Sequence, residues 1–221
     1  MGRTSDARER LIAATIDLIW MESYGAVTVD AICEQAGVKK GSFYHFFKSK
    51  EDLVVAALEA HWQSRRPSLD HLFSPSLPPL ERLRGYFASV YLRQRELRIA
   101  KGRTLGCLVN SVGVTCGQRE QPSISRKVQE ILASYLGYYE NALRDAAACG
   151  EIRTDDIPGT ARGLFALMEG VLAQARIQND PELVRPLAGL ALQFLGVIDE
   201  SAESAESAES ALLTTPETVA P

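Results

Sequence analysis

The chain contains 221 residues, of which 46% are hydrophobic and 24% are charged. This balance is typical of a globular protein, and the length allows a core that needs no disulfide bond or metal ion. The formal net charge of −4 at pH 7 argues by itself against a nucleic-acid partner, since DNA-binding proteins usually carry an excess of basic residues.

Three further features of the sequence exclude other classes of protein. The longest apolar stretch, residues 163–175, contains Glu169 and is shorter than the roughly 18 residues of a membrane span. The N-terminus is polar and does not resemble a signal peptide. No CxxC pair joins the four cysteines, which are Cys33, Cys107, Cys116 and Cys149. We therefore expect a cytoplasmic protein with reduced thiols, no contact with a membrane, no metal site and no cofactor.

Apolar residues recur at three- and four-residue steps along nearly the whole chain, which predicts an all-α fold. Thr28 is the expected N-cap of a short helix that Gly37 ends, and Ser49 forms a capping box with Asp52 at the start of a longer helix. Four prolines within residues 67–79 predict a break after it. The predicted helices cover about residues 6–23, 29–36, 40–47, 50–64, 78–97, 105–116, 121–149, 157–178 and 181–198.

The C-terminal segment differs in composition from the rest of the chain. Residues 201–210 repeat Ser-Ala-Glu without a large apolar residue, so we expect a disordered or weakly helical tail. Residues 199–221 carry six acidic residues and no Lys or Arg; without them the chain has 24 basic and 22 acidic residues, a net charge of +2. The acidic tail therefore accounts for the negative net charge, and the net charge of the remaining chain is compatible with DNA binding.

Residues 28–47 have the form of a helix-turn-helix, with a short helix, a glycine turn and a second short helix. Its lysines can neutralise phosphates, its hydroxyl and imidazole groups can donate to phosphates or base edges, and Gly41 lets the main chain approach a duplex. The candidate side chains are Lys39, Lys40, Ser42, Tyr44, His45 and Lys50. A helical hairpin with a solvated basic corner is the alternative interpretation.

The segment TVDAICEQAGVKKGSFYHFFKSKEDL, residues 28–53, closely resembles the DNA-binding signature of TetR-family transcriptional regulators. The resemblance covers about residues 8–58. It implies an N-terminal three-helix DNA-binding domain and a C-terminal helical domain for ligand binding and dimerisation. It also places Lys40 and Gly41 at the start of the recognition helix. The positions that commonly touch DNA in the family correspond to Thr28, Lys39, Ser42, Tyr44, His45 and Lys50.

With this resemblance, we expect a DNA-binding domain over residues 1–48, a ligand-binding and dimerisation domain over 49–198, and an acidic tail over 199–221. We assign Phe43, Phe46 and Phe47 mainly to the core of the first domain. Three arginines near the N-terminus form either an arm beside the minor groove or a solvated helix start; they are Arg3, Arg8 and Arg10.

Two apolar stripes on the last predicted helices, within residues 157–198, indicate either a dimer interface or intramolecular core. The family resemblance favours the interface, which would join two copies of the chain in a four-helix bundle. The stripes are Leu164, Leu167, Met168, Val171 and Leu172, and Leu183, Leu187, Leu190, Ala191, Phe194 and Ile198.

The Gly-Cys-Leu segment at Cys107 resembles a TetR subgroup whose members include regulators that respond to electrophiles and to acrylate-like acids. If Gly106 caps a helix, the helix dipole and nearby Lys101 or Arg103 would lower the pKa of this thiol and make it a sensor. A small buried residue is the alternative. The other pocket candidates combine apolar surface with a polar or polarisable group. The preferred set is Trp62, Tyr86, Cys107, Asn110, Tyr138 and Met168, and Tyr91, Tyr135 and Tyr139 are further candidates.

The resemblance to the TetR family therefore implies a ligand-responsive repressor that binds palindromic operator DNA as a homodimer and is released by a small molecule or electrophile of unknown identity. Ligand binding would shift the helix of residues 50–64, which joins both domains. An enzyme is disfavoured, since the chain has no nucleophile elbow, phosphate loop or dinucleotide fingerprint. A helical protein-binding adaptor without DNA activity is the second alternative.

Overall fold

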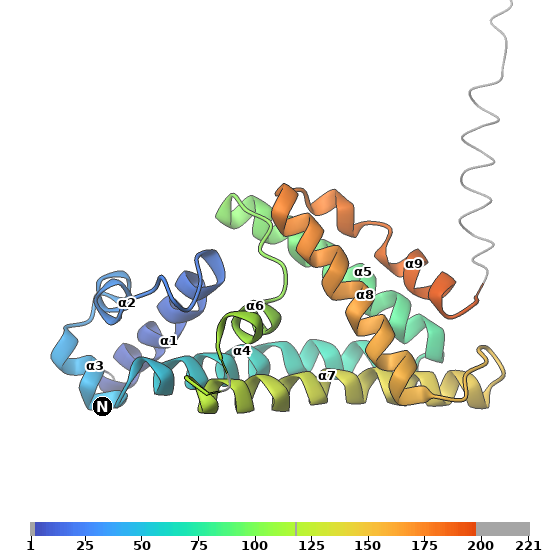
Figure 1. The fold of residues 1–221 in the computed structure, drawn as a ribbon, viewed down its shortest axis with the longest axis horizontal. Coiled ribbons are helices and arrows are strands. Elements are labelled where there is room, and N and C mark those ends of the chain that lie inside the picture. Colours follow the sequence, from blue (N-terminus) through green and yellow to red (C-terminus); the bar gives the residue numbers. More distant parts are fainter. Residues whose placement is uncertain (1–2, 118, 198–221) are drawn as a thin grey trace, which may run out of the picture.

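The structure is a computed structural model that describes residues 3–117 and 119–197, with side chains from Asp6 onward. In these ranges every regular element is a helix, which confirms the predicted all-α fold (Figure 1). The elements are α1 (Arg3–Met21), α2 (Val29–Ala36), α3 (Lys40–Phe46), α4 (Lys50–Leu72), α5 (Pro79–Lys101), α6 (Leu108–Thr115), α7 (Pro122–Ala148), α8 (Ile157–Gln178), the 3-10 helix η1 (Pro181–Val184) and α9 (Leu187–Phe194). The acidic tail predicted over residues 199–221 lies outside the described residues.

Helices α1, α2 and α3 form the N-terminal helix-turn-helix domain, and their buried residues belong to a core that continues into the rest of the chain. Leu11, Ile32 and Phe43, one from each helix, are fully buried. Thr28 caps α2 as predicted, because its Oγ1 accepts a hydrogen bond from the amide of Ala31 at 3.1 Å. Gly37 ends α2 in the left-handed conformation, with φ of 61°, that glycine adopts without strain. These caps fix the turn between α2 and α3.

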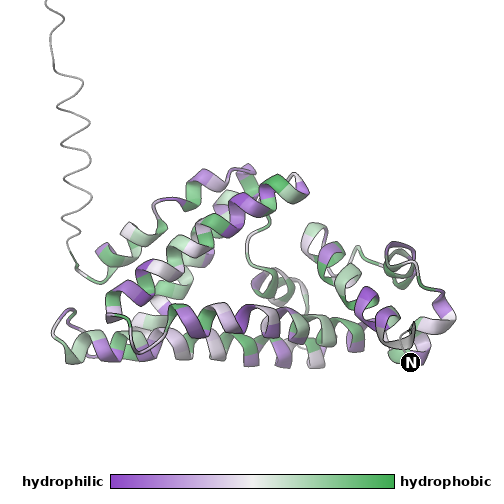
Figure 2. Cartoon of the chain, turned by 180° about the vertical axis from the view of Figure 1, so that it is seen from behind, coloured by the Kyte–Doolittle hydropathy of each residue, from purple (hydrophilic) through white to green (hydrophobic). Residues whose placement is uncertain are grey.

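The C-terminal domain is built on α4 and α7, which run side by side in the same direction along the length of the molecule (Figure 1). Glu51 with Ser123, Glu59 with Lys127 and Asp70 with Tyr138 form hydrogen bonds between them in register. Helix α8 packs across α7, and α5 packs against η1 and α9. The hydropathy colouring shows apolar and polar residues alternating along these helices (Figure 2), as expected of amphipathic helices that share a core.

Three predicted helix boundaries were wrong. Helix α4 continues through Pro67 to Leu72 because the residues beyond the proline still bury an apolar face, with Leu69 fully buried. The helix predicted over residues 181–198 is divided at Pro186, whose ring prevents a continuous helix, into η1 and α9.

The third boundary concerns the helix predicted over residues 105–116, which begins only at Leu108. Gly106 adopts a left-handed φ of 68°, which ends any helical path before it. Across the part of the chain that the structure describes, no helix combines the length and the apolar character that a bilayer crossing requires.

Candidate DNA-binding surface and ligand cavities

Helix α3 separates its apolar and polar side chains onto opposite sides. Phe43 and Phe47, four residues apart and therefore on one face, are 0% and 5% exposed. Phe46 packs partly buried against the same core, so the predicted role of these aromatic residues is confirmed. Tyr44 is 57% exposed, and its ring meets the edge of Phe43 at a centroid distance of 4.9 Å. Burial of Phe43 and Phe47 thus fixes the orientation of α3 so that its polar side faces solvent.

The other candidates on the polar side of α3 are also exposed: Lys39, Lys40, Gly41, Ser42 and His45. A side chain at Gly41 would meet no atom within 4 Å, which shows open space around the start of the helix. Lys40 forms an ion pair with Asp30 of α2 at 2.8 Å, and this hydrogen-bonded partner raises the pKa of Lys40. The Lys40 ammonium group therefore stays charged on a surface that a polyanion can reach.

Lys50 is placed differently from the other lysines. Its Nζ donates to the backbone oxygens of Tyr24 and Val27, each at 2.8 Å, and lies 4.0 Å from the centre of the Tyr24 ring. Burial lowers the pKa of Lys50. This ammonium group ties the start of α4 to the connection between α1 and α2, so we no longer expect it to reach a phosphate.

The arginines near the N-terminus also serve the domain itself. Arg10 donates from Nη1 to the oxygen of Ala36 at 2.9 Å and so caps the C-terminal end of α2. Arg8 lies over the Phe47 ring, 5.4 Å from its centre. Of the two interpretations that the sequence left open, these contacts favour a solvated helix start over a minor-groove arm for Arg8 and Arg10. The side chain of Arg3 lies outside the described part.

An inner cavity of about 70 Å³ lies between α4, α5, α7 and α8. Four predicted pocket residues line it: Tyr86, Cys107, Tyr135 and Met168. Its other polar side chains were not predicted from the sequence; they are His61, Arg65, Arg93 and Gln94. The hydroxyls of Tyr86 and Tyr139 both point to the sulfur of Met168, at 3.5 Å.

The inner cavity has a positive electrostatic character. Burial, reinforced by the charges of Arg65 and Arg93, lowers the pKa of His61 to about 4, so its imidazole is neutral at pH 7. Arg65 and Arg93 bring two guanidinium groups to the cavity wall. Apolar walls, two cations and a few orienting polar groups suit a small apolar ligand with an anionic or hydrogen-bond-accepting end.

Three other residues predicted to line a pocket lie outside this cavity. Asn110 lines a second cavity, described below. Trp62 and Tyr138 line neither cavity: the Trp62 ring packs edge-on to Tyr135 at 5.1 Å, and the Tyr138 hydroxyl donates to Asp70. Burial, followed by this carboxylate, raises the pKa of Tyr138 to about 12. These two aromatic residues pack α4 against α7 instead of facing a ligand.

Cys107 is the N-cap of α6 and does not lie in its first turn. Its Sγ accepts a hydrogen bond from the amide of Asn110 at 3.4 Å. Burial and the charge of Glu169 raise the pKa of the thiol well above its ordinary value, so the predicted lowering was wrong. Lys101, one of the cations expected to lower it, instead forms an ion pair with Asp17 at 2.9 Å.

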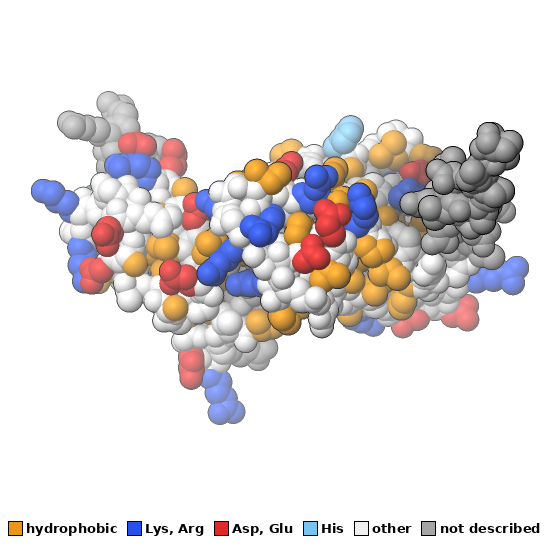
Figure 3. Space-filling view, turned by 90° about the horizontal axis from the view of Figure 1, so that it is seen from above, with side chains coloured by type: hydrophobic (Ala, Val, Ile, Leu, Met, Phe, Trp, Pro, Cys, Tyr) orange, Lys and Arg blue, Asp and Glu red, His pale blue; other side chains and the backbone are white. Residues whose placement is uncertain are grey.

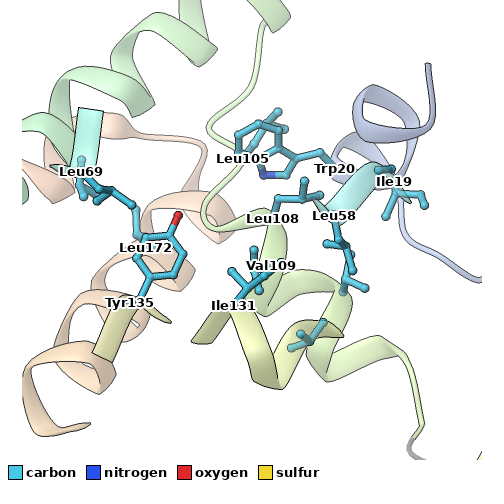
Figure 4. Packing of buried hydrophobic residues seen from close by; sticks show 14 of the residues in the cluster. Ile19, Trp20, Leu58, Leu69, Leu105, Leu108, Val109, Ile131, Tyr135 and Leu172 are labelled. Carbon is cyan, nitrogen blue, oxygen red and sulfur yellow. The ribbon is translucent and has the colours of Figure 1, made fainter. Parts of the chain in front are cut away.

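A second cavity of about 240 Å³, here called the junction cavity, lies between α1, α6 and α8. Beside it, Arg176 of α8 donates to the Trp20 oxygen at 3.1 Å, to the Leu105 oxygen at 3.0 Å and to Ser111 Oγ at 2.6 Å. The indole of Trp20 donates to the Gly106 oxygen at 3.3 Å and lies beside Leu105 (Figure 4). The end of α1 is therefore fastened directly to the C-terminal domain.

Comparison with known proteins agrees with this arrangement. The family model described as bacterial regulatory proteins, tetR family, matches residues 11–57, and the model for tetracyclin repressor-like C-terminal domains matches residues 79–188. Together they cover both helical domains.

Individual relatives extend the likeness along most of the chain. The transcriptional regulator AcuR of Cereibacter sphaeroides is 32% identical over 179 residues, which cover 80% of this chain and 79% of AcuR. The repressor NemR of Escherichia coli is 26% identical over 182 residues, with 80% and 87% covered. A crystal structure of a TetR regulatory protein from Rhodobacter sphaeroides superposes with a TM-score of 0.73 at 29% identity, covering 85% of this chain and 98% of the other.

The helix-turn-helix with its exposed polar face, the helical domain behind it and these matches lead to one assignment. The chain belongs to the TetR family of bacterial transcriptional regulators and is not an enzyme.

Proposed function

We propose that the protein is a repressor that binds a palindromic operator as a homodimer and leaves it when a small molecule or electrophile binds. The observation that carries the proposal is the two-sided α3, which buries Phe43 and Phe47 and exposes Ser42, Tyr44 and His45. NemR, among the relatives, is named as a repressor. The sign of regulation is taken from that likeness.

The homodimer is proposed to form through α8. Its outward side forms a groove of about 510 Å³ with the end of η1, lined by Ala166, Leu167, Gly170, Val171, Gln174, Gln178 and Leu183. Small residues let a second helix approach closely, and the apolar ones supply the area to be buried. The side that carries α5, α8 and α9 also shows apolar side chains exposed between charged ones (Figure 3). A two-fold axis here would present two α3 helices to half-sites about 34–36 Å apart.

The stripe predicted on the last helix contributes only in part to this face. Leu187 and Ala191 are fully buried within the chain's own core, whereas Leu190 and Phe194 are 37% and 51% exposed. Ile198 lies outside the described residues. The dimer proposal therefore relies on α8 and on the two exposed side chains of α9.

The proposed coupling runs from the inner cavity to α1 and α4. His61 and Arg65 of α4 line the cavity, and the His61 ring meets the edge of Trp20 of α1 at 5.5 Å. A ligand that binds more tightly to one setting of α4 shifts the population toward that setting. Because Lys50 fastens the start of α4 to the DNA-binding domain, the setting of α4 governs the position of α3.

The proposal is tested by titrating the DNA upstream of the protein's own gene with the full chain, by mobility shift or fluorescence anisotropy. We expect Tyr44→Ala to weaken binding by about 1–3 kcal/mol, which is typical of a lost DNA contact. The oligomeric state and the unfolding transition are expected to stay unchanged, because Tyr44 is exposed. His71→Ala, which removes an exposed ring near the opposite end of α4 from α3, is the control. Equal affinity of wild type and Tyr44→Ala would remove this side chain from the interface.

Salt dependence separates the regulator from a protein-binding adaptor. Binding through lysines releases counterions, so the logarithm of the association constant should fall steeply and linearly with the logarithm of salt concentration. Lys39→Ala should reduce that slope by about one while weakening binding to all sequences alike. An adaptor would show neither binding nor slope.

A further inference from the structure

The junction cavity is separate from the inner cavity and differs from it in chemistry. Ile19 of α1, with Glu22 and Ser23 just after its end, forms one wall, and Asn110 and Ser111 of α6 form another. Helix α8 closes it with Glu169, Leu172 and Arg176. Its volume of about 240 Å³ corresponds to about eight water molecules at about 30 Å³ each. Cys107 and Leu172 stand between the two cavities and line both.

The polar groups of the junction cavity differ in how many hydrogen bonds they already form within the protein. Arg176, the cation in its wall, already donates to three acceptors within the protein. Glu169 is different: its Oε1 is buried and has no hydrogen-bond partner among the described residues. A buried carboxylate oxygen without a donor is unfavourable, so a ligand that brings a donor gains more here than in water. Glu22 adds a second carboxyl group to the same cavity.

We propose that the junction cavity is a binding site for a small primary amine, whose ammonium group donates to Glu169 while its apolar body lies against Ile19 and Leu172. The inner cavity repels such a cation with Arg65 and Arg93. The two sites therefore select ligands of opposite charge. Because α1 forms a wall of the junction cavity, the amine contacts the DNA-binding domain directly.

The amine site is expected to depend on pH. Burial raises the pKa of Glu169 to about 7, although its contacts with Cys107 and Asn110 favour ionisation. Facing groups are Glu22 after the end of α1, Cys107 from the start of α6 and Arg176 from α8. Tyr86 of α5 and Tyr135 and Tyr139 of α7 also interact with its charge. Glu169 is mostly protonated at pH 6 and mostly ionised at pH 8, whereas an alkylammonium ion stays charged throughout. Affinity should therefore rise about 10-fold from pH 6 to pH 8.

The test is calorimetric titration of the full chain with benzylamine, and with benzyl alcohol as an uncharged analogue. We expect benzylamine to bind at pH 8, with at least 10-fold weaker binding of benzyl alcohol. Glu169→Gln should weaken benzylamine binding at least 10-fold and abolish its pH dependence. Glu151→Gln is the matched control, because Glu151 is exposed in the connection between α7 and α8 and does not line the cavity. It should leave benzylamine binding unchanged.

Two outcomes would overturn the proposal. One is equal affinity of Glu169→Gln and wild type for benzylamine; the other is binding by wild type that does not strengthen between pH 6 and pH 8. The pH measurement needs no variant, so it stands even if Glu169→Gln fails to fold. Both readouts are direct binding measurements without DNA, so they are independent of whether the protein is released from an operator.

Discussion

At the scale of single residues, burial sets the chemistry of the two cavities more than local sequence does. His61 and Glu169 are both partly buried titratable groups, and burial moves them in opposite directions: the pKa of His61 falls to about 4 and that of Glu169 rises to about 7. Each group is pushed toward its neutral form. The folded protein therefore holds a neutral imidazole beside two arginines and a carboxyl group that titrates near pH 7.

The first prediction concerns His61. Its pKa is lowered by folding, so the unfolded chain takes up a proton at higher pH than the folded chain does. The stability that it contributes is complete above about pH 6.5 and is lost as the pH falls toward 4. We expect wild type to lose about 2 kcal/mol more than His61→Gln between pH 7 and pH 5. Urea unfolding at the two pH values measures this difference, and parallel losses in both proteins would contradict it.

The second prediction concerns Cys107, for which the sequence left open an electrophile sensor or a small buried residue. Its raised pKa means that the neutral thiol predominates at pH 7, so its reaction is expected to be slow at pH 7 and faster as the pH rises. N-ethylmaleimide should then release wild-type protein from the operator but leave Cys107→Ser bound. Cys149→Ser, which alters an exposed thiol, is the control. Release of Cys107→Ser by the same reagent would assign sensing to another group.

At the scale of elements, the sequence predicts which segments are helical, because each has an apolar face at helical spacing. It fails where a distant contact decides the end of a helix. Pro67 reads locally as a break, but the buried Leu69 stabilises another turn and a half of α4. The division between η1 and α9 follows from Pro186, a local signal that the apolar periodicity of the segment obscured.

The same distinction applies to the candidate sites. The polar face of α3 was predictable, since neighbouring aromatic residues define its buried side. Tyr86, Cys107, Tyr135 and Met168 were also predicted to line a ligand cavity. Arg65, Arg93 and Arg176 were missed because an arginine on an amphipathic helix looks like a surface residue, and only the packing of other helices turns it inward.

The third prediction concerns the packing of α9 on α8. A Cβ atom at Gly163 would lie 2.6 Å from the ring of Phe194, so alanine there forces the ring to move. Without the ring, Gly163→Ala should stabilise α8 by about 1 kcal/mol through helix propensity. We expect that gain in the Phe194→Ala background, and a smaller gain or a loss in wild type. Urea unfolding of the four proteins gives the coupling energy; equal effects in both backgrounds would show that no contact exists.

At the scale of the whole molecule, the described helices leave two surfaces without a partner. One is the polar side of α3 and the other is the groove on α8. A dimer that buries the α8 groove of both copies presents two α3 helices to the DNA. This relation makes oligomeric state and operator affinity inseparable properties of the proposed repressor.

The fourth prediction tests this relation. Ala166 is exposed and lines the α8 groove, and Ala133 is an exposed alanine on α7. Ala166→Arg should shift the protein to monomers in light scattering and weaken binding to a palindromic site far more than to a half-site. Ala133→Arg introduces the same side chain and should change neither property. A dimeric Ala166→Arg would place the interface elsewhere.

Helix α4 has a mechanical consequence that follows from its length. His61 lies 11 residues from Lys50, which is about 16 Å at a rise of about 1.5 Å per residue. With the cavity as pivot, α4 is a lever arm: a tilt of about 10° moves its start by about 3 Å. In a two-fold dimer both arms swing together, and the gap between the recognition helices changes by about twice that distance. A ligand in a cavity of modest volume can therefore move both α3 helices out of register with the two major grooves at once.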